Sequence, residues 1–130
     1  MSFDSEVKAA ADQMMVDAAK FVEKNYSKVC NGIVADTPVI TGKLINNWNA
    51  TIGSPLAVDR SEGKSGQDSV SSYKAVAKEI TPKTIGQKFF LTNGVEYANS
   101  VEFGGEREPN RQWQNPKGML RTNIINAGTK

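Results

Sequence analysis

The sequence predicts an α+β domain in which a long N-terminal amphipathic helix packs on a small, mostly antiparallel sheet, with short additional helices and long loops. Apolar residues recur at steps of three and four through the first quarter of the chain, which is typical of a helix. Short aromatic and β-branched runs bounded by glycine, asparagine and proline follow, which is typical of strands joined by turns. A length of 130 residues suits one domain covering residues 1–130.

The first predicted element is a helix over residues 2–31. Ser2 or Asp4 can cap its start, Gly32 supplies its stop, and Lys24 and Lys28 lie near the negative end of the helix dipole. The single cysteine, Cys30, excludes an intramolecular disulfide, and we expect a buried apolar side chain there rather than a reactive thiol. The apolar face of the helix comprises Val7, Ala11, Met14, Ala18, Phe21, Val22 and Val29.

A turn and a second helix start are expected next, because Pro38 cannot continue a helix and Thr41 can cap a short one beginning near Lys43. Residues 49–53 read as a strand that Ser54 and Pro55 end. The side chains expected to share a buried face in this region are Leu44, Ile45 and Trp48.

The second half of the chain alternates polar stretches with short apolar ones. Residues 56–72 are rich in glycine, serine and charge, and residues 105–116 carry charges and prolines, so both are predicted to be flexible loops. A short helix is expected over residues 73–80, a strand at residues 89–91 with a turn after it, and a terminal helix over residues 118–126.

Composition excludes several classes of function. A net charge of +2 is too small to indicate nucleic acid, and without histidine the usual general base and metal ligand are missing. No apolar run is long enough to span a membrane and the N-terminus lacks the order of a signal peptide, so we expect a protein kept in a cytosol. Apparent phosphate-loop and Ser-x-x-Lys patterns lack the residues that should accompany them. We therefore expect no enzyme and no cofactor.

Two other functions stay open on the residues alone. Four glutamates could pair for acid and base work or bind a hard cation, as in a small hydrolase. A tryptophan among basic residues is typical of a small nucleic-acid-binding module, although neighbouring glutamates dilute the charge. The glutamates are Glu96, Glu102, Glu106 and Glu108, and the aromatic and basic residues are Arg107, Arg111, Trp113, Lys117 and Arg121.

Three separated segments carry a resemblance to a family. They read Pro-x-x-Thr-Gly-x-Leu at residues 38–44, Asn-x-x-x-Tyr-Ala-x-x-x-Glu-aromatic-Gly at residues 93–104, and Pro-x-Gly-Met-x-Arg at residues 116–121. In this order, behind an amphipathic helix, they resemble the neck or tail-completion proteins of tailed phages.

The resemblance implies a structural virion protein without catalysis or cofactor. In such a family, subunits with a helix packed on a sheet join in a ring, commonly a hexamer, between the head connector or adaptor and the tail tube or tail terminator. Double-stranded DNA passes through the ring without sequence recognition, and assembly takes place in the host cytoplasm before the protein resides in the virion. The tail terminator ring is the alternative role within the same class.

Residues of the three segments are the interface candidates. Tyr97 combines a large apolar face with a polar tip, and Gly104 and Gly105 allow the chain to leave the sheet sharply. Glu102 can face a neighbouring subunit or its own Arg121, and several of these side chains could equally serve the core. The candidates are Thr41, Gly42, Leu44, Tyr97, Glu102, Phe103, Gly104, Arg107, Arg111, Trp113, Met119 and Arg121.

Overall fold

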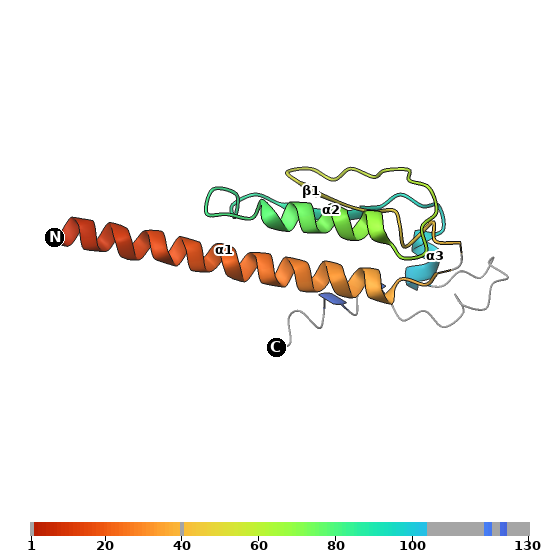
Figure 1. Ribbon diagram of the computed structural model, residues 1–130, viewed down its shortest axis with the longest axis horizontal. Coiled ribbons are helices and arrows are strands. Elements are labelled where there is room, and N and C mark those ends of the chain that lie inside the picture. Colours follow the sequence, from red (N-terminus) through yellow and green to blue (C-terminus); the bar gives the residue numbers. More distant parts are fainter. Residues whose placement is uncertain (1, 40, 104–118, 121–122, 125–130) are drawn as a thin grey trace.

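A computed structural model describes residues 2–39, 41–103, 119–120 and 123–124, without the side chains of residues 99, 100 and 103. Its elements follow the order α1 (Phe3–Asp36), β1 (Trp48–Ile52), α2 (Gln67–Lys78), β2 (Phe89–Asn93) and α3 (Ala98–Phe103). The strands pair antiparallel, with Ala50 opposite Leu91. The α+β class and the long N-terminal helix expected from the sequence are confirmed (Figure 1).

Helix α1 begins as its sequence predicts, with the Ser2 hydroxyl accepting a hydrogen bond from the Ser5 N–H at 3.2 Å. Its end was predicted wrongly, because the helix runs through Gly32 to Asp36 and has no basic residue in its last turn. Gly32 is required for space instead: a methyl group there would overlap the side chain of Asn123. The glycine therefore marks a close contact with the C-terminal part of the chain rather than a helix stop.

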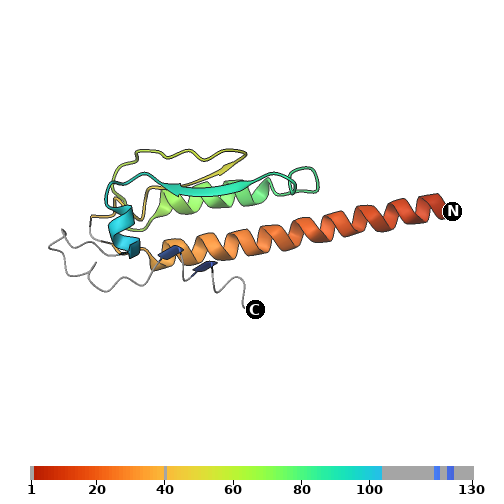
Figure 2. The ribbon, with the colours of Figure 1, turned by 180° about the vertical axis from the view of Figure 1, so that it is seen from behind.

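The N-terminal half of α1 extends well beyond the rest of the described chain (Figures 1 and 2). Its 34 residues measure about 51 Å along the axis. Its buried residues, which are Ala19, Cys30, Ile33 and Val34, all lie after residue 18, and none of the seven residues predicted to form its apolar face is buried. The first half is thus a projecting arm, which we call the α1 arm and define as residues 3–17.

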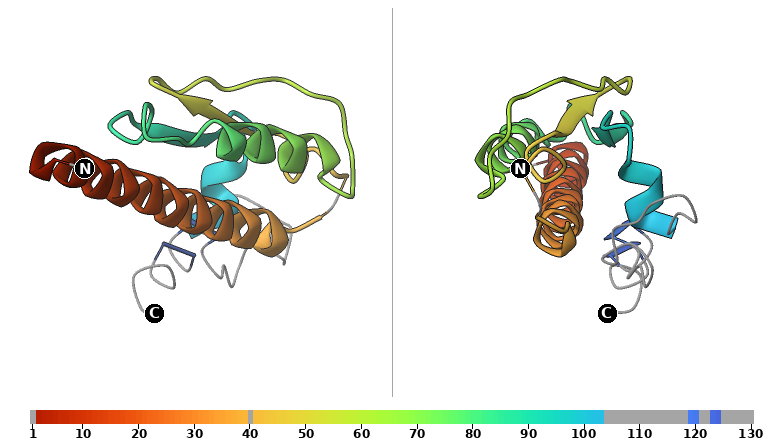
Figure 3. Two further views of the ribbon diagram at one scale, coloured as in Figure 1. Left: turned by 60° about the vertical axis from the view of Figure 1, so that its left-hand side comes forward. Right: turned by 90° about the vertical axis from the view of Figure 1, so that its right-hand side faces the viewer.

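The core lies where the C-terminal half of α1 meets α2 and the two strands (Figure 3). Trp48 is 2% exposed, and its indole N–H donates to the Thr37 hydroxyl at 3.0 Å. On the other strand, the Tyr26 hydroxyl donates to the Phe90 carbonyl at 3.1 Å, and the Tyr26 ring lies 5.8 Å from that of Phe89. These contacts tie both strands to the end of α1.

The segment after α1 is a turn rather than the predicted short helix. The Lys43 N–H donates to the Thr41 hydroxyl at 3.2 Å, and the chain then enters β1 at Trp48. The predicted burial of Leu44, Ile45 and Trp48 is confirmed.

Helix α2 starts six residues earlier than the sequence predicted and ends at Lys78. The interpretation of residues 56–72 as one loop was therefore wrong for residues 67–72, which form the first turns of α2. Gly66, with a φ of 65°, turns the chain into this helix.

The segment that includes Tyr97 and Glu102 was also predicted wrongly. Its residues were expected to leave the sheet at Gly104, but the chain leaves β2 at Asn93 and forms α3 before that point. Met119, Leu120, Asn123 and Ile124 are helical, in agreement with the predicted terminal helix. The predicted loop over residues 105–116 lies outside the described residues.

Candidate functional site and assembly surfaces

The three segments that carry the family resemblance meet at one end of the molecule. The Asn93 side-chain amide donates to the Leu44 carbonyl at 2.9 Å, which joins the second segment to the first. The Leu120 N–H donates to the Glu102 carboxylate at 2.8 Å, which joins the third segment to the second. We call this group of segments the motif cluster.

Within the first segment, Gly42 lies in close contact with the backbone of residues 63 and 64. It has a φ of +90°, and a methyl group there would lie 2.6 Å from the Lys64 backbone nitrogen. Its carbonyl accepts from the Gly63 N–H at 3.1 Å. Thr41 beside it is exposed, whereas Leu44 is buried.

The second and third segments form a buried joint. Glu102 is 2% exposed, and its carboxylate faces the chain's own terminal helix through Leu120. Met119 is buried in the same place, and a hollow of about 240 Å³ separates this joint from Trp48 and β2. Glu102 and Met119 thus make contacts inside the subunit. They can affect an interface only indirectly, by holding the exposed residues around them in place.

Several predicted interface residues lie outside the described residues, and a contact between Glu102 and Arg121 stays a prediction. The described part of the chain gives the helical backbone of Phe103 without its side chain. The candidates outside the described residues are Gly104, Arg107, Arg111, Trp113 and Arg121.

A shallow pocket of about 450 Å³ lies between the first two segments. Lys43, Asp59 and Tyr97 are among the residues that line it. The Lys43 ammonium donates to the Asp59 carboxylate at 2.5 Å, and this hydrogen bond and charge hold the pKa of Asp59 below its usual value. Because Asp59 is exposed, solvent screens this pair and it adds little to stability. Half-buried Tyr97 presents part of its surface here.

One edge of the sheet is closed by side chains. The Trp48 N–H donates to the Ser69 hydroxyl and the Ala50 N–H to the Ser72 hydroxyl, each at 2.8 Å. The Arg60 guanidinium donates to the Trp48 carbonyl at 2.7 Å. Three backbone groups of β1 that a further strand could pair with, the N–H groups of Trp48 and Ala50 and the Trp48 carbonyl, are therefore already occupied.

A group of polar side chains holds the closing loop in place. Arg60 also donates to the Asn46 carbonyl and the Asn49 side chain, and its own N–H donates to Asn47. Sequence reasoning missed these residues, which it assigned to a flexible loop or left without a role. The available signal was the run of three asparagines around Trp48, because buried amides need fixed partners.

The other edge of the sheet is open within the described chain. The backbone N–H groups of Trp48 and Ala50 point away from β2. In an antiparallel sheet, such a residue exchanges no hydrogen bonds with the residue opposite it on the neighbouring strand. Leu91, opposite Ala50, therefore turns its N–H and C=O outward, and no described residue bonds to either group. An open edge of this kind can accept a strand from another chain.

Burial affects the proton affinity of two side chains on α1, Cys30 and Tyr26. Burial raises the pKa of the Cys30 thiol to about 12, which leaves it protonated and unreactive at neutral pH. Burial and the neighbouring thiol raise the pKa of Tyr26 as well. Among the described residues no three His, Cys, Asp or Glu side chains gather closely enough to hold a metal ion. No helix in the same part of the chain is long and apolar enough to cross a bilayer.

Comparisons of the chain with models of known families, with curated proteins and with solved structures found no match.

Proposed function

We propose that the protein is a structural subunit of a tailed-phage head–tail junction, a neck or tail-completion protein that forms a ring with copies of itself. The observation that supports this most is the motif cluster. Three short patterns, separated by about 50 and 10 residues, lie together at one end of the molecule and are joined by hydrogen bonds of 2.9 and 2.8 Å. Patterns that matched by chance have no reason to meet.

The surfaces of the described chain suit an assembly subunit. An open β2 edge and a projecting α1 arm with exposed apolar side chains are features that isolated domains usually cover or avoid. Thr41 and Tyr97 give the motif cluster a surface of its own, next to the pocket that Lys43 and Asp59 line. In the proposed role, this surface contacts a neighbouring subunit or the connector, and DNA passes through the ring without sequence recognition.

A ring should be visible directly. We expect electron micrographs of the purified protein, alone or mixed with a head connector, to show closed rings whose mass is a multiple of 14.1 kDa. A protein that stays without rings and binds neither connector nor tail would contradict the proposal. The tail-terminator alternative predicts binding to tails and none to the connector.

A matched pair of variants locates the contact. Thr41 and Thr81 are both exposed and each accepts a hydrogen bond from the N–H two residues on, at 3.2 Å. Thr41 belongs to the motif cluster and Thr81 does not. Thr41→Arg should abolish the ring while Thr81→Arg leaves it intact, and equal behaviour of the two variants would place the contact elsewhere.

A further inference from the structure

Five residues on α1 form a regular apolar seam. Val7, Ala11, Met14, Ala18 and Phe21 follow one another at steps of four, three, four and three, which is a seven-residue repeat with alanine alternating with larger side chains. This repeat is typical of helices that pair along a continuous contact, and alanine at alternate positions lets the two backbones approach closely. We call these residues the α1 seam.

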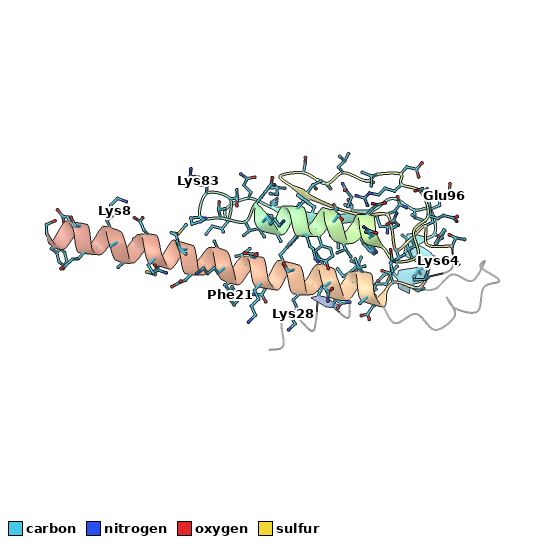
Figure 4. All side chains as sticks on the ribbon, viewed as in Figure 1. Lys8, Phe21, Lys28, Lys64, Lys83 and Glu96 are labelled. Carbon is cyan, nitrogen blue, oxygen red and sulfur yellow. The ribbon has the colours of Figure 1, made fainter. Side chains whose placement is uncertain are left out.

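The seam faces away from the body of the protein. Val7 is 50%, Met14 70% and Phe21 60% exposed. On a helix with 100° per residue, the seam lies roughly 120° around the axis from the buried Ala19 and Cys30. Figure 4 shows Phe21 on the side of α1 turned away from α2. The seam is therefore a second apolar face, in addition to the one that α1 uses for its own core.

The apolar surface that matches this seam best is the seam itself. Outside α1, the exposed large apolar side chains of the described chain are Val39, Leu56 and Ile124, which come from separate segments and form no stripe. We propose that two copies of the chain pair through their α1 seams as an antiparallel coiled coil, a two-fold contact in which each seam covers the other. This pairing rests on the seam alone and not on the proposed function.

Charge favours the antiparallel arrangement. Residues 3–17 hold four acidic side chains and one lysine, a net charge of −3, whereas residues 18–28 hold three lysines and one glutamate, a net charge of +2. Antiparallel pairing brings Asp4 and Glu6 of one helix to the lysine-rich part of the other and also opposes the helix dipoles. Parallel pairing would set the same acids beside their copies.

The same charges disfavour an anionic lipid surface as the occupant. Helices that lie on such membranes carry lysine and arginine beside their apolar face, whereas the α1 arm is acidic.

Two matched variants test the pairing. Ala11→Glu places a carboxylate in the seam, and Ala9→Glu makes the same change at an exposed position 200° further round the helix. In sedimentation velocity at micromolar concentration, we expect the wild type and Ala9→Glu to contain the pair. Ala11→Glu should raise its dissociation constant by about 100-fold, because a charge in an apolar contact is costly. Near-ultraviolet circular dichroism of the aromatic side chains, which include buried Trp48 and Tyr73, checks that both variants keep the folded core. A wild type that stays monomeric at high micromolar concentration, or equal masses for the two variants, would overturn the proposal.

A spin label tests the direction. Because Cys30 is buried and its thiol stays protonated, Glu6→Cys can be labelled selectively. In the antiparallel register that places Ala11 of one helix opposite Met14 of the other, position 6 lies near position 19 of the other helix, so the two labels are offset by about 20 Å along the axis. Two labels found side by side, without this offset, would refute the antiparallel pair. A measurement that detects no interaction between labels on two copies would refute it as well.

Discussion

Cys30 couples stability to alkaline pH. Its thiol has a pKa of about 12 in the folded protein against 9.0 when unfolded. Above pH 9 the unfolded thiol therefore loses its proton while the native one keeps it, and the free energy of unfolding falls as pH rises. Below about pH 8 the thiol is protonated in both states and the effect vanishes. The fall approaches about 1.4 kcal/mol per pH unit for one group.

We expect urea unfolding between pH 9 and 10 to show this slope in the wild type and a much shallower one in Cys30→Ala. Tyr26 and Tyr73, whose pKa values are also raised by burial, contribute mainly above pH 10, so the difference between the two proteins in the lower interval reports the cysteine. Both proteins should show equal slopes between pH 7 and 8. Parallel curves up to pH 10 would show that the thiol is not the cause.

Gly32 and Asn123 form a coupled pair. Replacing a glycine inside a helix by alanine usually stabilises it by about 1 kcal/mol, because the unfolded chain loses freedom. Here a methyl group would displace Asn123, whose amide donates to the Asp36 carboxylate at 2.9 Å and to the Met119 carbonyl at 2.7 Å. Gly32→Ala should therefore increase the free energy of unfolding only when Asn123 is also replaced by a residue with a shorter side chain.

A double-mutant cycle measures this coupling. Gly32→Ala should be neutral or destabilising in the wild type and stabilising by about 1 kcal/mol in Asn123→Ala, as judged by denaturant unfolding. Additive effects would mean that Asn123 moves aside without cost.

At the scale of elements, the closed edge of β1 depends strongly on one small group, a serine hydroxyl. Ser69 is completely buried and is the acceptor for the Trp48 N–H. Ser69→Ala leaves that donor without a partner, which costs about 1–3 kcal/mol. Ser71→Ala changes an exposed serine of the same helix and should alter the free energy of unfolding by less than about 0.5 kcal/mol. A similar loss in both variants would show that helix propensity, and not the hydroxyl, is responsible.

Arg60 holds the loop between β1 and α2. Arg60→Met keeps most of the side-chain length but removes its bonds to Asn46, Trp48 and Asn49. We expect proteinase K to cut within residues 54–66 at least tenfold faster in this variant. Lys64→Met, at an exposed position of the same loop, serves as control and should be cut at the wild-type rate. Unchanged cleavage in Arg60→Met would assign the loop's stability to Asn46 and Asn47 instead.

The parts of the fold that periodicity governs could be predicted from the sequence. A long N-terminal helix and a strand at residues 89–91 are present as predicted, and Leu44, Ile45 and Trp48 are buried as expected. The apolar face predicted for α1 was wrong, because the helix packs on its core through Ala19, Cys30, Ile33 and Val34, which are not members of the predicted stripe. The early start of α2 could not be read from its pattern, since Ser69 and Ser72 face inward to serve β1 and look like loop residues. In the same way, Gly32 was interpreted as a helix stop because its contact with Asn123, a residue distant in sequence, cannot be recognised from the local pattern.

The candidate site was predictable in part. The sequence identified the three segments, and their meeting depends on Asn93 and Glu102, which bond to backbone groups far along the chain. Such partners leave no local pattern, so the direction in which Glu102 points could not be derived from spacing.

For the whole molecule, the α1 arm should be ordered by association. A helix of 15 residues that packs against no other described segment is marginal in water, so the arm of an isolated subunit should fray. In the Ala11→Glu variant, amide hydrogens of residues 3–17 should exchange within seconds, whereas in the wild-type pair they should be protected. Amides in the C-terminal half of α1 should exchange equally in both proteins. Protection of the arm in monomeric Ala11→Glu would contradict this expectation.

The two edges of the sheet differ, and a strand from another chain can be added more easily at one edge than at the other. A sheet that continues around a ring needs β2 of each subunit to meet β1 of the next, but Ser69, Ser72 and Arg60 already occupy three of the backbone groups of β1 that such a contact would use. Among the described strands, β2 is therefore the edge that a strand from another chain can join, and we expect addition to stop after one step rather than to propagate into a fibril. In a ring built from this subunit, we expect side chains of helices and loops, rather than a continuous ladder of backbone hydrogen bonds between the described strands, to close the circumference.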